Sequence, residues 1–143
     1  MEIERITEIS DEVVDAFNFL VPQLSTSSLI PTREHLAEIA ANESLLIARD
    51  PQQGGRIVGS LTLVTFRIPT GVRAWIEDVI VDQAQRGKGI GEALTRGALT
   101  RAAELGAKTV DLTSRPSREA ANRLYQRVGF KLRESNLYRY TIS

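Results

Sequence analysis

Hydrophobic residues recur along this chain with two periods, and the period separates predicted helices from predicted strands. Four stretches place apolar residues three or four positions apart, as on the buried face of a helix. The clearest is the stripe Ile90, Leu94, Ala98, Ala102 and Leu105. Shorter runs rich in β-branched residues, bounded by Gly, Pro, Asn or Asp, have the pattern of strands.

These patterns predict four helices and seven strands. The predicted helices are Ser10 to Leu20, Arg33 to Ala41, Ile90 to Leu105 and Pro116 to Val128, with Ser10 and Thr32 as N-caps and Gly106 and Gly129 as stop signals. The predicted strands are Glu2 to Glu8, Ser44 to Arg49, Arg56 to Phe66, Val72 to Asp82, Lys108 to Thr113, Phe130 to Leu132 and Leu137 to Ile142.

The predicted element order is β-α-α-β-β-β-α-β-α-β-β, an α/β (α+β) arrangement with a central mixed sheet. Strands joined by tight turns pair antiparallel, so most of the sheet is expected to be antiparallel. The strands on either side of the third helix are joined by a crossover and are expected to be parallel, with a right-handed connection. The chain has 143 residues, which suits a single domain over residues 1–143 with helices flanking the sheet.

Composition and charge exclude several classes of function. Lys+Arg and Asp+Glu both number 18, so no global field favours nucleic acid or a membrane surface as partner. The chain has no cysteine, which excludes disulfides, thiolate metal sites and a cysteine nucleophile, and fits a reducing cytoplasm. The one histidine, His35, cannot build a metal site alone, and we expect it on the solvated surface. No secretory signal or membrane span is evident.

A glycine-rich turn follows the strand that ends in Val79, Ile80 and Val81. In the segment Arg86 to Gly91, every second residue is glycine (Gly87, Gly89 and Gly91), and Arg86 and Lys88 supply positive charge. Such a turn at a helix N-terminus presents unpaired N–H groups to an anion, and the helix dipole adds positive potential. The spacing is neither a Walker loop nor a dinucleotide fingerprint. A turn that merely needs glycines is the alternative, but three alternating glycines with interleaved cations favour a phosphate-binding loop.

The pattern Arg86-x-x-Gly89-x-Gly91 resembles the GNAT superfamily of acyl-CoA-dependent N-acyltransferases, and the element order is similar to the GNAT fold. The resemblance implies that the coenzyme A pyrophosphate is held by the loop residues Arg86, Gly87, Lys88, Gly89, Ile90 and Gly91. It also implies that the backbone of Val79, Ile80 and Val81 bonds the pantetheine and the acetyl carbonyl, where an N–H would stabilise the developing oxyanion.

A second segment, from Asn122 through Tyr125 to Gly129 and Phe130, resembles the family's Asn-x-x-Tyr-x-x-x-Gly-Phe motif. The resemblance implies that Tyr125 protonates the departing thiolate and that Asn122 bonds the pantetheine arm. Many relatives carry an asparagine seven residues before the tyrosine, where this chain has Arg118. With a thiol pKa near ~8.5 and a tyrosine pKa near ~10, proton transfer is uphill by roughly 2 kcal/mol. From helical position alone a half-buried core residue would be favoured, and the joint occurrence with the glycine loop reverses that preference.

Glu77 and Asp78 are the candidate general bases, because an amine acceptor is mostly protonated at neutral pH. Regular pleating would direct only one of them into the cleft, whereas a β-bulge could bring both near it. Ile76-Glu77-Asp78 resembles the same strand in glucosamine-6-phosphate N-acetyltransferases, where these acids lie at the acceptor site. The alternative is a buried carboxylate paired with a local arginine such as Arg73. Thr113 and Ser114 end the next strand, where the parallel strands are expected to splay.

The sequence therefore predicts an acetyl-CoA-dependent N-acetyltransferase that works by direct transfer to a primary amine of a small molecule or peptide, with acetyl-CoA as cosubstrate and no metal. The alternatives are a non-catalytic acyl-CoA-binding sensor or interaction module, and a nucleotide-binding regulator. A homodimer is possible. The loop Val21 to Pro31 and the Arg67 to Val72 turn are expected to select the acceptor. Four arginines could hold an anionic acceptor, although surface roles suit each of them: Arg67, Arg73, Arg115 and Arg118.

Overall fold

The computed structural model describes all 143 residues, in two compact units, Met1–Thr113 and Ser114–Ser143. The first unit contains a five-stranded sheet in the order β1-β2-β3-β4-β5, antiparallel except for the parallel pair β4 and β5. The strands are β1 (Glu2–Ile6), β2 (Ser44–Asp50), β3 (Arg56–Ile68), β4 (Gly71–Val81) and β5 (Thr109–Asp111). The predicted mixed, mostly antiparallel sheet is therefore confirmed.

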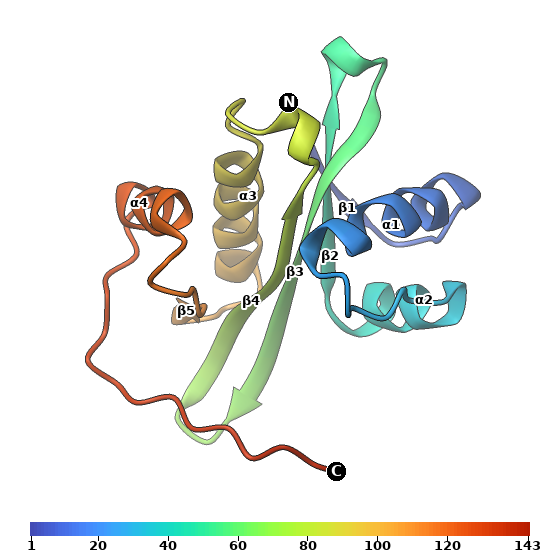
Figure 1. Ribbon diagram of the computed structural model, residues 1–143. Helices are drawn as coiled ribbons and strands as arrows, with labels where there is room; N and C mark the ends of the chain where they lie inside the picture. The colour runs from blue at the N-terminus through green and yellow to red at the C-terminus, as the bar shows by residue number, and fades with distance from the viewer. The chain divides into compact units, whose positions relative to one another are not determined.

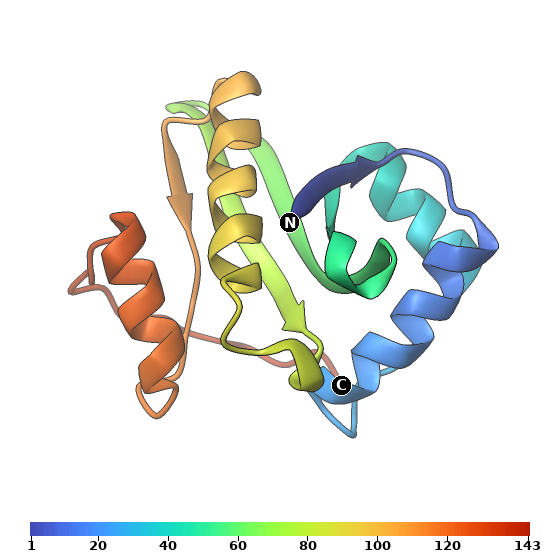
Figure 2. The same cartoon turned by 90° about the horizontal axis from the view of Figure 1, so that it is seen from above.

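Three helices of the first unit flank this sheet: α1 (Asp11–Leu24), α2 (Arg33–Asn42) and α3 (Ile90–Glu104). Figures 1 and 2 show α1 and α2 on one face of the sheet and α3 on the other. The core under α1 and α2 includes Phe17, Leu20, Leu36 and Ile80. On the other face, the predicted α3 stripe is buried as far as Ala102, and Leu105 lies at the exposed C-cap.

The predicted caps of the first two helices are present. Ser10 Oγ accepts a hydrogen bond from the Val13 N–H, and Thr32 Oγ1 accepts one from the His35 N–H. His35 is exposed, as expected, and its Nδ1 completes the cap by accepting a hydrogen bond from the Thr32 N–H. The sequence could not assign this capping role, because histidine is not one of the usual capping-box residues.

The predicted end of the first helix at Leu20 is wrong, because α1 continues through Pro22 to Leu24. A proline inside a helix removes one backbone hydrogen bond, which favoured a loop from Val21 onward. Val21 is buried in the core and the helix is maintained through this turn. The extension shortens the loop before α2 to residues 25–32.

The second unit contains α4 (Glu119–Val128), which ends at Gly129 as predicted. The helix begins later than Pro116, because Pro116 and Ser117 form a turn that the Arg118 N–H closes onto the Arg115 carbonyl. The Phe130 ring contacts the Tyr125 ring edge-on, with centroids 5.8 Å apart.

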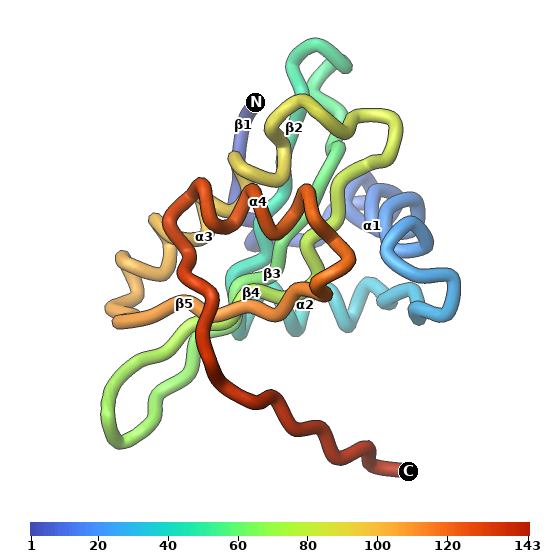
Figure 3. The backbone as a smooth tube through the Cα atoms, turned by 60° about the vertical axis from the view of Figure 1, so that its left-hand side comes forward, coloured from blue at the N-terminus to red at the C-terminus, as the bar shows by residue number.

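The two predicted C-terminal strands, Phe130 to Leu132 and Leu137 to Ile142, are wrong. Residues 130–143 form no helix or strand (Figure 3). Their alternating apolar residues are exposed, with Leu132 at 91% and Tyr140 at 89%. Alternation alone does not make a strand, since the backbone N–H and C=O groups also need a paired neighbour. The prediction of one domain over residues 1–143 stays a prediction.

Candidate active site

The glycine-rich turn forms a cradle of backbone amides at the start of α3. Gly87 has φ +83° and Gly89 has φ +80°, a left-handed conformation that residues with a Cβ adopt only at a cost. Gly89 is the N-cap of α3 and no side chain caps this helix. The backbone N–H groups of residues 87–91 have no acceptor within the chain. A Cβ at Gly87 or Gly89 would meet nothing within 4 Å, so the space beside both glycines is open.

The turn that leads into the cradle is held by buried polar groups. Asp82, 3% exposed, accepts a hydrogen bond from the Ala84 N–H at 3.1 Å and pairs with Arg56 at 3.3 Å. The Gln85 side chain is buried and accepts a hydrogen bond from the Lys88 ammonium. Because these contacts lie at the base of the turn, Arg86 remains exposed beside the cradle. The arrangement suits a diphosphate, which requires several N–H donors and nearby positive charge.

Strand β4, which leads into the cradle, is unpaired on its β5 side over its last residues. β4 and β5 pair only over Arg73↔Thr109, Ala74↔Val110 and Trp75↔Asp111. Beyond Trp75, β4 continues to Val81 with no partner on the β5 side. The expected splaying of the two parallel strands is thus observed, and it frees the backbone of Val79, Ile80 and Val81 on that edge. The Ile80 side chain belongs to the core, so a ligand along this edge of β4 would contact the Ile80 backbone.

A β-bulge interrupts β4 directly after Glu77, at the second of the two candidate bases. Glu77 pairs with Thr62 and Ile80 with Ser60, so Asp78 and Val79 together oppose Leu61. Asp78 has φ +47° and is the one non-glycine residue of the chain with a positive φ. Strained backbone of this kind clusters at functional sites. The expected bulge is confirmed, and the role of both acids at the cleft stays a prediction.

The alternative of a buried carboxylate paired with Arg73 is not observed. Glu77 and Asp78 are exposed, and Arg73 donates to Thr70 instead. Glu77 accepts a hydrogen bond from Trp75 Nε1 at 2.7 Å, which fixes the orientation of its carboxylate. Trp75 was not predicted as a site residue. Its position two residues before Glu77, on the same face of a strand, is the signal that could have identified it.

A cavity of about 360 Å³ opens next to the bulge, between the sheet and the α1–α2 segment. Nine of its twelve lining residues are apolar, and Asp78 is the only charged one. Ser28, Leu29 and Pro31 of the loop before α2 line it, together with Thr62 and Ile80 of the sheet. The loop Val21 to Pro31 thus lines a cavity, and its role in selecting the acceptor stays a prediction. None of the four arginines considered for an anionic acceptor lines the cavity.

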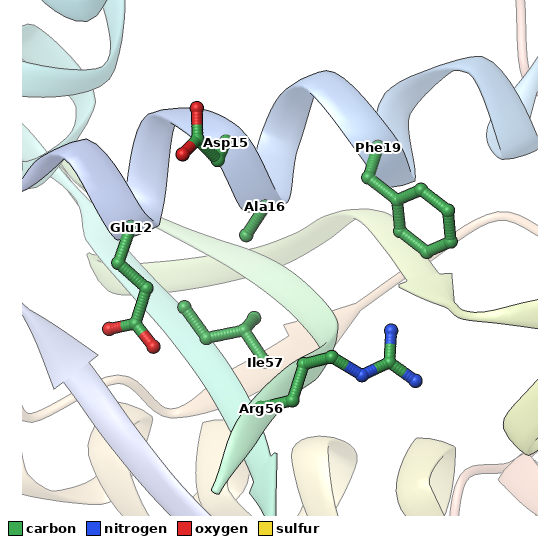
Figure 4. A pocket seen from close by; sticks show the side chains of 6 residues that line it. All are labelled: Glu12, Asp15, Ala16, Phe19, Arg56 and Ile57. Carbon is green, nitrogen blue, oxygen red and sulfur yellow. The ribbon is translucent and has the colours of Figure 1, made fainter. Parts of the chain in front are cut away.

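A second cavity, of about 490 Å³, lies between α1 and the start of β3 (Figure 4). Two of its three charged residues are already paired, because Glu12 binds Arg49 at 2.8 Å and Arg56 binds Asp82. The Arg56 guanidinium also lies 6.0 Å from the centre of the Phe19 ring. Figure 4 shows the Asp15 carboxylate pointing away from Arg56. This cavity contains neither candidate base, so it is not the candidate active site.

Helix α4 carries the second predicted motif. Tyr125 is 9% exposed, and burial raises the pKa of its phenol while Arg118 opposes the shift. Asn122 donates from Nδ2 to the Arg115 carbonyl at 2.9 Å, which closes the loop before the helix. Because Nδ2 makes this bond, Asn122 Oδ1 is the side-chain atom that remains available to accept a hydrogen bond from a ligand. Ser114 Oγ is buried with no hydrogen-bond partner.

These features define a mixed-sheet acyltransferase fold with an amide cradle at the end of β4. The sequence matches the model of the Acetyltransferase (GNAT) family over residues 7–130. The chain therefore belongs to the GNAT acetyltransferase family. A comparison with curated proteins finds no match. No group of three or more His, Cys, Asp or Glu side chains could hold a metal ion, and none of the helices is long and apolar enough to cross a bilayer.

Solved structures share the fold. An aminoglycoside acetyltransferase, meta-AAC0020, from an uncultured soil metagenomic sample is similar with a TM-score of 0.83 and 22% identity, over 99% of this chain and 95% of that one. An acetyltransferase from Trypanosoma brucei has a TM-score of 0.77 and 25% identity, over 98% and 99%. Glucosamine-6-phosphate N-acetyltransferase from Arabidopsis thaliana has a TM-score of 0.76 and 18% identity, over 97% of each chain.

Proposed function

We propose that this protein is an N-acetyltransferase that moves the acetyl group of acetyl-CoA to a primary amine in a ternary complex. One observation supports the proposal above the others. A cradle of unpaired amides begins α3, and the strand that leads to it bulges at Asp78, which lines a cavity one residue after Glu77. Two similar structures are named for acceptors that contain amines, an aminoglycoside and glucosamine-6-phosphate.

The donor side of the proposal depends on the cradle. Acetyl-CoA supplies the acetyl group as a thioester. The N–H groups of residues 87–91, with Arg86 and Lys88, fit its diphosphate, because charge-assisted bonds to backbone amides need no side-chain ordering. The unpaired edge of β4 at Val79, Ile80 and Val81 fits an extended pantetheine arm, which would add to the sheet as a strand does.

The acceptor side depends on the acids at the bulge. An amine with a pKa near ~10.4 must lose a proton before its nitrogen can attack the acetyl carbon. We assign that proton to Asp78 or Glu77, directly or through water. The Trp75 hydrogen bond orients the Glu77 carboxylate, and the cavity exposes Asp78 to an acceptor.

The departing sulfur requires a proton once the new C–N bond forms and the C–S bond breaks. We assign this proton to Tyr125. Burial raises the pKa of its phenol, so the group stays protonated through neutral pH. The same shift widens the gap to the thiol beyond the roughly 2 kcal/mol of the unperturbed groups. Tyr125 therefore has the correct protonation state, and the transfer is efficient only while the thiolate is forming.

Two measurements on purified protein test the proposal. Calorimetric titration with acetyl-CoA measures donor binding, and release of free thiol in the presence of a panel of primary amines measures transfer. We expect saturable binding and amine-dependent thiol release. Binding without release for every amine would favour the alternative, a non-catalytic acyl-CoA sensor. Stabilisation by ATP with no response to acetyl-CoA would refute the donor assignment.

A further inference from the structure

The cavity beside the bulge has a composition that selects among amines. Its only charge is the Asp78 carboxylate, and no Lys or Arg side chain lines it. Its three polar lining residues are Ser28, Thr62 and Asp78. A phosphorylated amine would need a cation in such a cavity, and a polycation would need several carboxylates. The lining provides neither, so both acceptor classes are disfavoured.

The rest of the lining is apolar and comes from both sides of the cavity. Phe17 and Leu24 belong to α1, Leu29 to the loop before α2, and Ile80 to β4. Leu29 is 92% exposed and Leu24 is 39% exposed, although both line the cavity. Large aliphatic side chains at the mouth of a cavity contribute little to the fold. They would lose their contact with water only when an apolar group entered.

We infer that the acceptor is a monoamine with an extended apolar body, whose ammonium group lies at Asp78 and whose hydrocarbon part fills the cavity between α1, the loop before α2 and the sheet. The inference rests on the proposed function, because it names the substrate class of the same site. A volume of about 360 Å³ lies within the range of small-molecule sites. Charge complementarity orients the acceptor in the cavity, because Asp78 has the one carboxylate that the ammonium group can approach.

Two amines of equal size test the apolar requirement. Heptylamine and 2-(2-methoxyethoxy)ethylamine have the same number of heavy atoms, but the second replaces two methylenes with ether oxygens. Each buried methylene contributes about fourfold to binding. We therefore expect heptylamine to exceed the ether by about tenfold or more, both in kcat/KM for thiol release and in calorimetric affinity with coenzyme A present. A series from propylamine to octylamine should rise about fourfold per added methylene until the cavity is full.

A pair of variants locates the effect in the cavity. Leu29→Ser removes an exposed apolar group at its mouth, and we expect the preference for heptylamine over the ether to fall severalfold. Leu105→Ser is the matched control, because Leu105 is 37% exposed at the end of α3 and does not line the cavity. We expect the control to keep the preference of the unchanged protein.

The outcomes separate this inference from the proposed function. Thiol release at equal rates with heptylamine and its ether, or a clear preference for an aminoglycoside or for phosphoethanolamine, would overturn the apolar acceptor and leave the N-acetyltransferase intact. Chain-length-dependent binding without any thiol release would support the cavity's selectivity and refute the proposed function. Neither binding nor release for the whole series would overturn the apolar acceptor, and the proposed function would be refuted as well only if no amine of any class released thiol from acetyl-CoA.

Discussion

The conformation of Gly89 yields a prediction that separates ligand binding from folding. In a Gly89→Ala variant the new Cβ meets no atom within 4 Å, so no clash arises. The cost comes from φ +80°, which destabilises a residue with a Cβ by roughly 1–2 kcal/mol. Reduced freedom of the unfolded chain offsets about 0.4–1 kcal/mol of this. We expect a net loss near 1 kcal/mol, or a fall in Tm of roughly 3–5 °C.

The effect on donor binding should be larger than the effect on stability. The Cβ would project into the open space beside the cradle, and relief of the strain would turn the N–H groups of residues 87–91 away from a common point. A hydrogen bond to a charged acceptor is worth about 1.5–3 kcal/mol. Loss of one such bond to the diphosphate should raise the Kd for acetyl-CoA by roughly 10- to 100-fold, measured by calorimetry.

Gly54 offers a matched control within the same compact unit. It has φ +69° in the turn between β2 and β3, and a Cβ there also meets nothing within 4 Å. Gly54→Ala should lower the Tm by a similar amount and leave the Kd within about twofold, since the turn contains no donor aimed at a ligand. Equal Kd values for the two variants would refute the assignment of the cradle to the diphosphate, whatever their stabilities.

Three further predictions concern the acids, the phenol and an ion-pair network. Asp78→Asn should lower kcat/KM by roughly 10²–10⁴-fold in thiol release while the Kd for acetyl-CoA is kept; a loss under threefold would remove Asp78 as base. Tyr125→Phe should lower kcat by a similar factor. Because burial raises the Tyr125 pKa above 10.0, kcat of the unchanged protein should fall with rising pH only above pH 10. Arg49→Met should cost about 1 kcal/mol in urea denaturation at pH 7, since Arg49 binds Glu4 and Glu12. Because Arg49 lowers the Glu12 pKa from 4.5, that cost should shrink as the pH falls below about 4.5.

The parts of the fold that the sequence predicted are those with a local physical signal. Ser10 and Thr32 are recognisable caps, and the stripe from Ile90 to Ala102 keeps one period over about three turns. The signal of the glycine loop is equally local, because glycine adopts the positive φ found at Gly87 and Gly89 without steric cost. The element order of the first unit and the cradle therefore followed from pattern alone.

The errors occur where a distant neighbour decides the outcome. The segment from Phe130 to Ile142 alternates like a strand, yet a strand forms only when another backbone pairs with it, and the sequence does not state whether one does. Pro22 favoured a helix end, but the buried side chain of Val21 lies in the core and the helix continues past it. In both places tertiary contacts, or their absence, overrode local preference.

The acid pair shows how strand register, which a short sequence motif does not fix, shapes a candidate site. Two adjacent strand residues face opposite sides unless the register changes, and here it changes because Leu61 opposes both Asp78 and Val79. The extra residue adopts φ +47°, a sparsely populated conformation that costs of order 1 kcal/mol and that aspartate tolerates better than most residues with a Cβ. A regular ladder would avoid that cost and direct Asp78 away from the cavity that it now lines. Because strained residues of this kind cluster at functional sites, we propose that the conformation of Asp78 serves the role of its carboxylate at the cavity.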